Sequence, residues 1–495
     1  MKSITDHFDV VVVGCGMAGL SAALSAAEKG AAVAVLDRAP HGEHGGNTRY
    51  TEAFLRMKNE GEIAEDFEEH LIENAGGHLD PTLVAMTSSD RASWPSVLKA
   101  MSFADPELVS TFAGSVVPTI SWLKSFSIRF DSLPTAHLTR NMPRTMPIGG
   151  GLAMIEALEA GAKKHDITFF YETTAVDLIQ AQDGAVVGVL AAGKRNKRTQ
   201  IRGDAVVLAS GGFEGNTEML TRYLGPRALN LRPFAQGGHF NKGEGIEMAL
   251  RIGAAPCGEY GNYHASPMDP RSGRPAPSVY IFPYGILVNG HGRRFVDEAP
   301  GTVDETYELI CRQILDQPES IAYAVLDAKL TDIPNYQRSL RTDQPAITSP
   351  TLKGLASKIG VPEAALEETV TQFNRACTKG RFSPFELDSL CTTSLTPPKS
   401  NFARPIEQPP FHAYPIISSN VFTFGGLKVN SQARVLNRDG EEIPGLYAAG
   451  ETVGIYYKSY TGATSVLKAA VFGRIAGLDA VHASAEERSV TSATN

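Results

Sequence analysis

The N-terminal segment places the strongest constraint on the fold. Residues 8–14 read FDVVVVG, a β-branched run typical of a parallel strand that is buried on both faces. The glycine pattern GCGMAG follows at 14–19, then the helical stretch LSAALSAAEKG and a second apolar run, AAVAVLD, which ends at Asp37. This order of strand, GxGxxG, helix, strand and acid predicts a βαβ unit that binds a dinucleotide.

Each residue of this pattern has a physical role. Gly14 permits the tight turn, Gly16 lets the backbone approach a pyrophosphate, and Gly19 lets the helix pack closely on the strand. The helix N-terminus offers unpaired N–H groups to phosphates. Asp37 follows at about the 20-residue spacing expected of a carboxylate that binds ribose hydroxyls.

Two further segments favour FAD over a nicotinamide dinucleotide. Residues 45–51 read GGNTRYT, where a chain returning to the cofactor would line a flavin. Residues 444–451 read PGLYAAGE, and the small-residue helix TGATSVLKAAVFGRIAG follows at 461–477. Small residues allow close packing against a ring system and its ribityl chain. An ordinary C-terminal helix would explain the last segment but not the Gly-Glu turn before it.

The bulk composition excludes some classes of partner. The net charge of −8 provides no basic excess for nucleic acid. The five cysteines form no CxxC pair, which suits reduced thiols. The sequence begins MKSITDHFDV, without a cationic segment followed by an apolar core, and no apolar run approaches the roughly 18 residues of a membrane span. We expect a cytoplasmic protein that does not span a membrane.

Taken together, these segments resemble the fumarate reductase/succinate dehydrogenase flavoprotein superfamily over roughly residues 8–480. The shared motifs are VVVVGCGMAGLSAA, GGNT, DAVVLASGGFEGN (204–216), GGHFNKGEG (237–245), GRRFVDE (292–298) and LYAAGE. Within the superfamily, the chain is most similar to the tricarballylate dehydrogenases, through GGNTRYT, MPIGGGLAMIEAL (146–158), LTPPKSNFARPIEQPPF (395–411) and KSYTGATS (458–465). Related desaturases share many of these stretches.

The resemblance implies an α/β fold with a split, Rossmann-like FAD-binding domain of the glutathione-reductase type and an inserted α+β capping domain. We predict the FAD-binding domain at 1–261 and 404–481, the cap at 262–403 and a disordered tail at 482–495. The sequence agrees, because the Rossmann-type pattern lapses after ASGG at 209–212 and residues 262–403 are irregular and richer in proline. The active site is expected between the two parts.

The resemblance also implies a set of cofactor-binding residues. These are Gly14, Gly16, Ala18, Gly19, Asp37, Arg38, Gly45, Gly46, Asn47, Thr48, Gly150, Gly151, Val176, Ser210, Gly211, Gly450, Glu451, Ser465 and Val466. Glu451 resembles the carboxylate that holds the ribityl chain, and Val176 the residue whose backbone pairs with adenine. Tyr50 stands where tricarballylate dehydrogenases have a histidine, so we predict non-covalent FAD.

Four residues are candidates for catalysis: Tyr460, Tyr284, His264 and Arg294. His264, in GNYHASP, matches a histidine that bonds a substrate carboxylate in the superfamily. Arg294 lies in GRRFVDE, where an equally weighted alternative is a structural role through Asp297 or Glu298. Tyr460, in SYTGA, resembles a tyrosine of the ketosteroid Δ1-dehydrogenases.

The sequence does not decide which tyrosine acts in catalysis. Tyr284 and Tyr280 compete with Tyr460, and a packing role for any of them is about as probable as catalysis. A tyrosine with a pKa near 10 acts as a base only where cations lower that pKa, and Lys458 or an arginine would have to do so. Positive charge for a polycarboxylate could also come from Arg140, Arg144, Arg271 and Arg274.

The chain departs from the fumarate reductases at three polar positions. The segment EAPGTVDETYEL at 298–309 lacks an arginine, and Phe422 replaces a histidine. The arginine ahead of the last glycine-rich helix is absent, and Tyr460 or Lys458 stands there. Fumarate reduction itself is therefore not expected.

We expect an FAD-dependent dehydrogenase that desaturates a C–C bond α,β to a carboxylate or ketone, with tricarballylate, converted to cis-aconitate, as the lead substrate. One alternative is a ketosteroid-type ketone desaturase or an enoate or fumarate-type reductase, and another is a flavoprotein electron-transfer subunit. No haem or iron–sulfur ligand set is present in the sequence. Electrons would therefore pass to a separate protein, a quinone or dioxygen, and no metal is expected.

Overall fold

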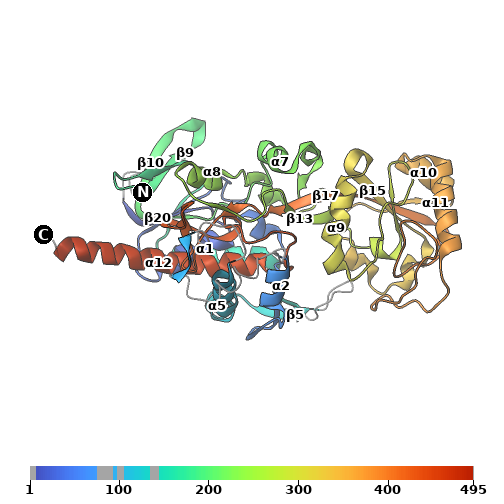
Figure 1. The fold of residues 1–495 in the computed structure, drawn as a ribbon, viewed down its shortest axis with the longest axis horizontal. Coiled ribbons are helices and arrows are strands. Elements are labelled where there is room, and N and C mark those ends of the chain that lie inside the picture. The colour runs from blue at the N-terminus through green and yellow to red at the C-terminus, as the bar shows by residue number, and fades with distance from the viewer. Residues whose placement is uncertain (1–6, 75–92, 97–104, 134–143, 494–495) are drawn as a thin grey trace.

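The computed structural model describes residues 7–74, 93–96, 105–133 and 144–493. Figure 1 shows an elongated molecule with two parts along its long axis. One part holds the first strands and the last helix, which extends from its outer end. The other part comes from the later middle of the sequence, drawn in yellow and orange. We call this second part the cap.

The first part is built on an eight-stranded sheet. Its strands follow the order β19-β20-β10-β1-β2-β7, and β9 and β8 extend it beyond β10. The strands are β1 (Phe8–Val13), β2 (Val33–Leu36), β7 (Thr168–Phe170), β8 (Thr174–Gln180), β9 (Val186–Ala192), β10 (Arg198–Leu208), β19 (Arg434–Leu436) and β20 (Glu442–Ala448). Strands β20, β10, β1, β2 and β7 run parallel, so segments from the two ends of the sequence share one sheet.

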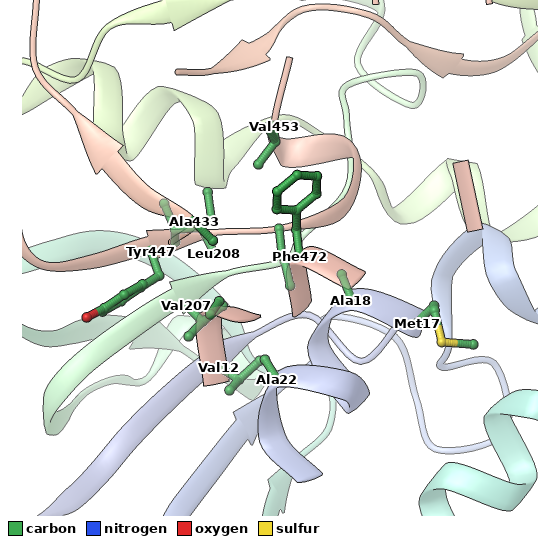
Figure 2. Packing of buried hydrophobic residues seen from close by; sticks show 14 of the residues in the cluster. Val12, Met17, Ala18, Ala22, Val207, Leu208, Ala433, Tyr447, Val453 and Phe472 are labelled. Carbon is green, nitrogen blue, oxygen red and sulfur yellow. The ribbon is translucent and has the colours of Figure 1, made fainter. Parts of the chain in front are cut away.

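Helices α1 (Met17–Ala27), α8 (Glu244–Arg251) and α12 (Ser465–Ala493) pack against this sheet. Helix α6 (Gly150–Lys164) packs on α1, α5 (Pro106–Ser125) on α12, and α2 (Phe67–Asn74) on α5. This part also holds α7 (Thr217–Leu224). Figure 2 shows buried side chains of β1, α1, β10, β20 and α12 in one cluster. Helices α1 and α12 approach so closely that only glycine fits at two positions of α12. A Cβ atom on Gly473 would lie 2.3 Å from the Ala18 carbonyl oxygen, and one on Gly477 would lie 2.2 Å from the Ala22 carbonyl oxygen.

The cap is built around a second, mixed sheet. Its order is β11-β17-β15-β14, and β13 and β16 also pair with β17. The strands are β11 (Arg232–Pro233), β13 (Tyr263–Met268), β14 (Ile286–Asn289), β15 (Ile321–Leu326), β16 (Ile347–Ser349) and β17 (Phe411–Thr423), and the helices are α9 (Val303–Leu315), α10 (Leu352–Ile359) and α11 (Glu363–Ala376). The cap has two buried apolar clusters of its own.

The long strand β17 joins the two parts. Its first half pairs with β15 and β16, and its second half pairs with β13 and β11. The cap sheet therefore continues past residue 404, where the sequence predicts the FAD-binding domain to resume. We retain an inserted cap as a proposal and place its second boundary within β17.

Among the described residues, three antiparallel sheets of two strands each complete the fold. They are β3 (Met57–Asn59) with β4 (Glu62–Ile63), β5 (Phe130–Leu133) with β6 (Arg144–Pro147), and β12 (Pro256–Cys257) with β18 (Gly426–Leu427).

The C-terminal end differs from the sequence prediction. A disordered tail is predicted over 482–495, whereas α12 continues to Ala493. The segment HASAEER contains alanine, glutamate and arginine, which have high helix propensity. It extends a helix that is already formed, so no new nucleation is needed.

Candidate active site and cofactor cavity

We call the first part of the molecule the FAD-binding part, after the domain that the sequence predicts there. A cavity of about 1070 Å³ lies between this part and the cap. The predicted residues that line it are Gly14, Gly16, Ala18, Asp37, Arg38, Gly46, Asn47, Thr48, Ser210, Gly211, His264, Gly450, Glu451, Tyr460, Ser465 and Val466. The glycine motif at the N-terminus and the Gly-Glu turn near the C-terminus therefore open onto the same space.

The glycine motif has the backbone that its sequence predicts. Gly14 has φ +107°, and a Cβ atom there would lie 2.3 Å from the Ala209 carbonyl oxygen. A Cβ atom on Gly19 would lie 1.9 Å from the Gly14 carbonyl oxygen, so only glycine lets α1 start this close to β1. Gly16 precedes the first residue of α1 and lines the cavity. The positive end of α1 therefore faces the cavity, where it suits a pyrophosphate.

Asp37 lies at the end of β2, next to the glycine turn. Its Oδ2 accepts the Cys15 amide N–H at 2.8 Å, and its Oδ1 accepts the Ala39 amide N–H at the same distance. Burial raises the pKa of this carboxyl group, although the two amides oppose the shift. Beside it, Arg38 forms an ion pair with Glu244 at the start of α8. Both members of that pair line the cavity.

Glu451 has a buried partner that the sequence analysis missed. Lys468 of α12 donates from Nζ to Glu451 Oε2 at 2.7 Å, and the lysine side chain is fully buried. Burial raises the pKa of Glu451 and lowers that of Lys468. The mutual attraction of the two charges offsets both shifts, so this pair keeps the start of α12 against the Gly-Glu turn.

The GGNT loop is held by a second buried carboxyl group. Asn47 Nδ2 donates to Glu214 Oε1 at 2.6 Å and to the Val421 carbonyl oxygen at 2.9 Å. Asn241 Nδ2 donates to the same Glu214 oxygen at 2.6 Å. Burial raises the pKa of Glu214 to about 7, against the lowering effect of the two amides. Thr48 Oγ1 accepts the Met17 amide N–H at 3.3 Å and ties this loop to the start of α1.

Five residues that the sequence predicts to bind the cofactor do not line the cavity. They are Gly19, Gly45, Gly150, Gly151 and Val176. A Cβ atom on Gly151 would lie 1.7 Å from the Thr48 carbonyl oxygen. The Val176 carbonyl oxygen accepts from Arg251 at 3.1 Å, and its neighbour Ala175 lines the cavity instead.

His264 and Tyr460 meet at the cap side of the cavity. Their ring centroids are 4.4 Å apart, and each ring centroid lies 5.1 Å from that of Phe422. His264 Nδ1 bonds Glu308 Oε1 of α9 at 2.5 Å, and Glu308 Oε2 accepts the Tyr460 amide N–H at 3.2 Å. Four segments that are distant in the sequence thus form one aromatic and acidic cluster.

The state of Tyr460 differs from what a tyrosine base requires. Its hydroxyl oxygen accepts the amide N–H groups of Thr464 and Ser465, each at 3.0 Å, and its O–H donates to Ser465 Oγ at 3.1 Å. Burial raises the pKa of Tyr460, and the charge of Glu451 adds to the rise. Lys458, which the sequence offers as a cation that could lower this pKa, is exposed to solvent, and no lysine or arginine of the described residues is among the groups that act on the pKa of Tyr460. Tyr460 therefore keeps its proton at neutral pH.

The structure places Tyr284 and Arg294 outside the cavity lining. Tyr284 donates its O–H to the Pro384 carbonyl oxygen at 2.6 Å within the cap core. Arg294 donates to both carboxylate oxygens of Glu298, at 2.9 and 2.7 Å. These contacts match the structural alternative for Arg294, and we do not propose either residue for catalysis.

The cap adds three arginines to the cavity lining, besides Arg38 of the FAD-binding part. The three are Arg274, Arg338 and Arg341, and Arg341 forms a 2.5 Å ion pair with Glu52 of the FAD-binding part. Arg271, by contrast, binds the fully buried carboxylate of Asp269. Arg140 lies outside the described residues, and Arg144 begins β6.

The cavity fits the shape and chemistry of FAD. A glycine turn and a helix N-terminus suit the pyrophosphate, Asp37 suits the ribose, and the long space continues to the GGNT loop and Glu451. Ser210 also lines this space, and its hydroxyl oxygen is buried without a hydrogen-bond partner among the described residues. A bound group would supply the missing partner.

The comparisons with known proteins agree with this site. A sequence model of the FAD binding domain family matches residues 9–467. The chain therefore belongs to this family and to the fumarate reductase/succinate dehydrogenase flavoprotein superfamily. The predicted fold class, the predicted cofactor FAD and the predicted enzyme class, an oxidoreductase, are confirmed at this level.

The sequence identity between this chain and individual relatives is low. The chain is 28% identical to NADH:acrylate oxidoreductase of Vibrio harveyi over 96% of its own length, and it spans only 50% of that protein. It is 31% identical to 4-oxocyclohexanecarboxylate 2-dehydrogenase of Sinomonas cyclohexanicum, over 65% of this chain and 58% of the relative. The open conformation of a flavocytochrome c3 fumarate reductase matches with TM-score 0.73 and 25% identity, over 97% of this chain and 79% of that one.

Four functional residues escaped the sequence analysis: Glu214, Glu244, Glu308 and Lys468. Each is a charged residue inside a segment that was singled out for other reasons, such as the lysine in TGATSVLKAAV. For Glu214, Glu244 and Lys468 a charge within a glycine-rich or small-residue segment was the available signal, whereas Glu308 lies in VDETYEL, where no such pattern marks it. Among the described residues, no group of His, Cys, Asp or Glu side chains could hold a metal ion. No helix in this part of the chain is long and apolar enough to cross a membrane.

Proposed function

We propose that this protein oxidises or reduces a C–C bond next to a carbonyl group in a substrate that carries a carboxylate. The observation that supports it is the division of the cavity between two kinds of wall. The cluster of His264, Tyr460 and Phe422 offers aromatic surface and a phenol, whereas Arg274, Arg338 and Arg341 of the cap offer positive charge.

When bound, FAD supplies the hydride acceptor or donor for this chemistry. Oxidation also moves a proton from the neighbouring carbon to a base, and reduction takes one from an acid. The protein binds and orients the substrate. Tyr460 keeps its proton, and its O–H can turn from Ser465 Oγ to donate a hydrogen bond to a carbonyl oxygen of the substrate. That hydrogen bond stabilises negative charge that develops on the oxygen. The aromatic rings around it exclude water. Guanidinium groups bind carboxylates in a planar fork, which positions the substrate.

The lead substrate is tricarballylate, oxidised to cis-aconitate. It carries several carboxylates, and the arginines of the cap match that charge. The sequence resemblance to tricarballylate dehydrogenases supports this choice. Reduced FAD would then pass its electrons to a separate acceptor, a protein, a quinone or dioxygen.

A second candidate is a ring ketone that carries a carboxylate. The aromatic faces of Tyr460 and Phe422, with ring centroids 5.1 Å apart, favour a flat or cyclic skeleton over an open-chain acid. The relative named 4-oxocyclohexanecarboxylate 2-dehydrogenase supports this candidate, because that name describes both groups in one molecule.

Anaerobic bleaching of the flavin tests these candidates. The holoenzyme is mixed with tricarballylate, succinate, 4-oxocyclohexanecarboxylate and neutral cyclohexanone, and the dithionite-reduced enzyme with cis-aconitate and fumarate. We expect tricarballylate to bleach the flavin and cyclohexanone to leave it oxidised. Bleaching by the keto acid alone would replace the lead substrate with the second candidate. Bleaching by cyclohexanone alone would contradict the carboxylate requirement.

A further inference from the structure

Glu308 is a buried acid that the chemistry described above does not use. It lies in the middle of α9, its side chain is 10% exposed, and it faces the cavity cluster instead of solvent. An ionised carboxylate at such a depth needs several donors, since its loss of hydration is otherwise costly. Its partners therefore show what its position serves.

The two oxygens of Glu308 hold two different donors. Oε1 bonds His264 Nδ1 at 2.5 Å, and Oε2 accepts the backbone N–H of Tyr460 at 3.2 Å. Arg312, one turn further along α9, adds a weak contact to Oε2 at 3.5 Å and donates to the Tyr263 carbonyl oxygen at 3.1 Å. One carboxylate of the cap thus holds both residues that border the cavity.

The bond from Glu308 also determines how His264 presents itself. A carboxylate accepts hydrogen bonds, so His264 must carry its proton on Nδ1. The ring orientation is then set, and Nε2 is the atom left for the cavity. The Tyr460 ring packs against this histidine with centroids 4.4 Å apart, so a shift of either ring moves the other.

We propose that Glu308 is the positioning residue of this site, holding the Nδ1 proton of His264 and the amide of Tyr460 so that both side chains keep one arrangement toward the substrate. The inference rests on the proposed function, because it assigns the two rings to substrate. Glu308 itself touches neither substrate nor cofactor and acts through the other two residues.

The variant Glu308→Gln separates positioning from folding. The Tyr460 N–H is always a donor, so the glutamine oxygen faces it and the amide NH₂ faces His264 Nδ1. The loop keeps its bond, whereas the histidine loses its acceptor and its proton must move to Nε2. Glu308→Ala removes both bonds. Glu305→Gln, on the exposed side of the same helix, is the matched control.

Two measurements test the proposal. With the substrate that bleaches the flavin, Glu308→Gln should lower kcat at least about tenfold with little change in KM. In a His264→Asn background the same change should cost less than about twofold, because the residue it positions is gone. Equal losses in both backgrounds, or no loss in the native one, would overturn the proposal. Glu305→Gln should match the unmodified protein throughout.

The second measurement needs no substrate. Hydrogen exchange of the peptide over residues 456–464 should quicken by about tenfold in Glu308→Ala and stay near the native rate in Glu308→Gln. Unchanged exchange in Glu308→Ala would overturn the proposal whatever the substrate panel gives. A panel in which nothing bleaches the flavin, together with quickened exchange in that variant, would reject the proposed function and leave the positioning role standing.

Discussion

At the scale of single residues, the structure around the cavity depends on buried charged groups that each have a specific hydrogen-bond partner. Glu451 and Lys468 would each be a costly buried charge without the other, and Glu308 would lose its short hydrogen bond without His264. Tyr460 follows the same logic with a neutral group, because two backbone N–H groups and Ser465 Oγ surround its hydroxyl.

The variant Tyr460→Phe tests the phenol directly. It removes the O–H that we propose to stabilise charge on the substrate, while the ring can keep its packing against His264. Flavin reduction should slow at least tenfold, a barrier increase of roughly 1.4 kcal/mol. Stopped-flow absorbance under anaerobic conditions measures this rate. Tyr284→Phe, far from the cavity lining, is the control. An unchanged rate in Tyr460→Phe would remove the phenol from the mechanism.

Sequence alone located most of the cofactor cavity at this scale but few of the charge partners. Gly14, Gly16 and Asp37 belong to a local pattern whose spacing carries its own geometry, and all three line the cavity. Glu308 meets His264 only after α9 packs on β13, and no local spacing encodes that contact. Tyr284 and Arg294 were chosen from motif context, but their partners lie within the cap.

At the scale of elements, the contact between α1 and α12 brings the two ends of the FAD-binding part together. Small residues on both helices allow it, and the backbone of Ala18, which borders the cavity, is the surface that Gly473 meets. The helical periodicity of each segment was visible in the sequence. Their mutual packing was not, because it depends on β1 and β20 joining through β10.

The variant Gly473→Ala tests this contact. Its Cβ atom would sit 2.3 Å from the Ala18 carbonyl oxygen, so the helices must separate, and we expect a loss of about 1–3 kcal/mol in the free energy of unfolding together with weaker FAD retention. Gly114→Ala in α5 is the matched control, since nothing lies within 4 Å of its Cβ position. That change should be neutral or stabilise by up to about 1 kcal/mol. Equal stability of the two variants, from chemical denaturation, would contradict the packing argument.

At the scale of the whole molecule, the cap and the FAD-binding part meet around the substrate. On one side of the cavity, Glu308 of the cap accepts a hydrogen bond from the Tyr460 amide. On another side, Arg341 of the cap forms an ion pair with Glu52 of the FAD-binding part. Arg341 is 33% exposed and Glu52 40% exposed, so this ion pair would contribute little to holding the two parts together. Its position in the cavity lining makes a role in binding an anion the better explanation.

A substrate carboxylate and Glu52 would compete for Arg341, and this competition predicts opposite effects from the two partners. Arg341→Gln removes the cation and should raise KM for a carboxylated substrate by about tenfold or more, since a charge-assisted hydrogen bond contributes about 1.5–3 kcal/mol. Glu52→Gln frees the cation and should lower that KM. Neither variant should change the binding of neutral cyclohexanone, measured by competition with the substrate. Arg293→Gln, whose partner Glu368 lies on the cap surface, is the control. If Arg341→Gln and Glu52→Gln instead raised KM for the substrate alike and both weakened the binding of cyclohexanone, the pair would serve to hold the two parts together, and the anion would have to bind elsewhere on the cap wall.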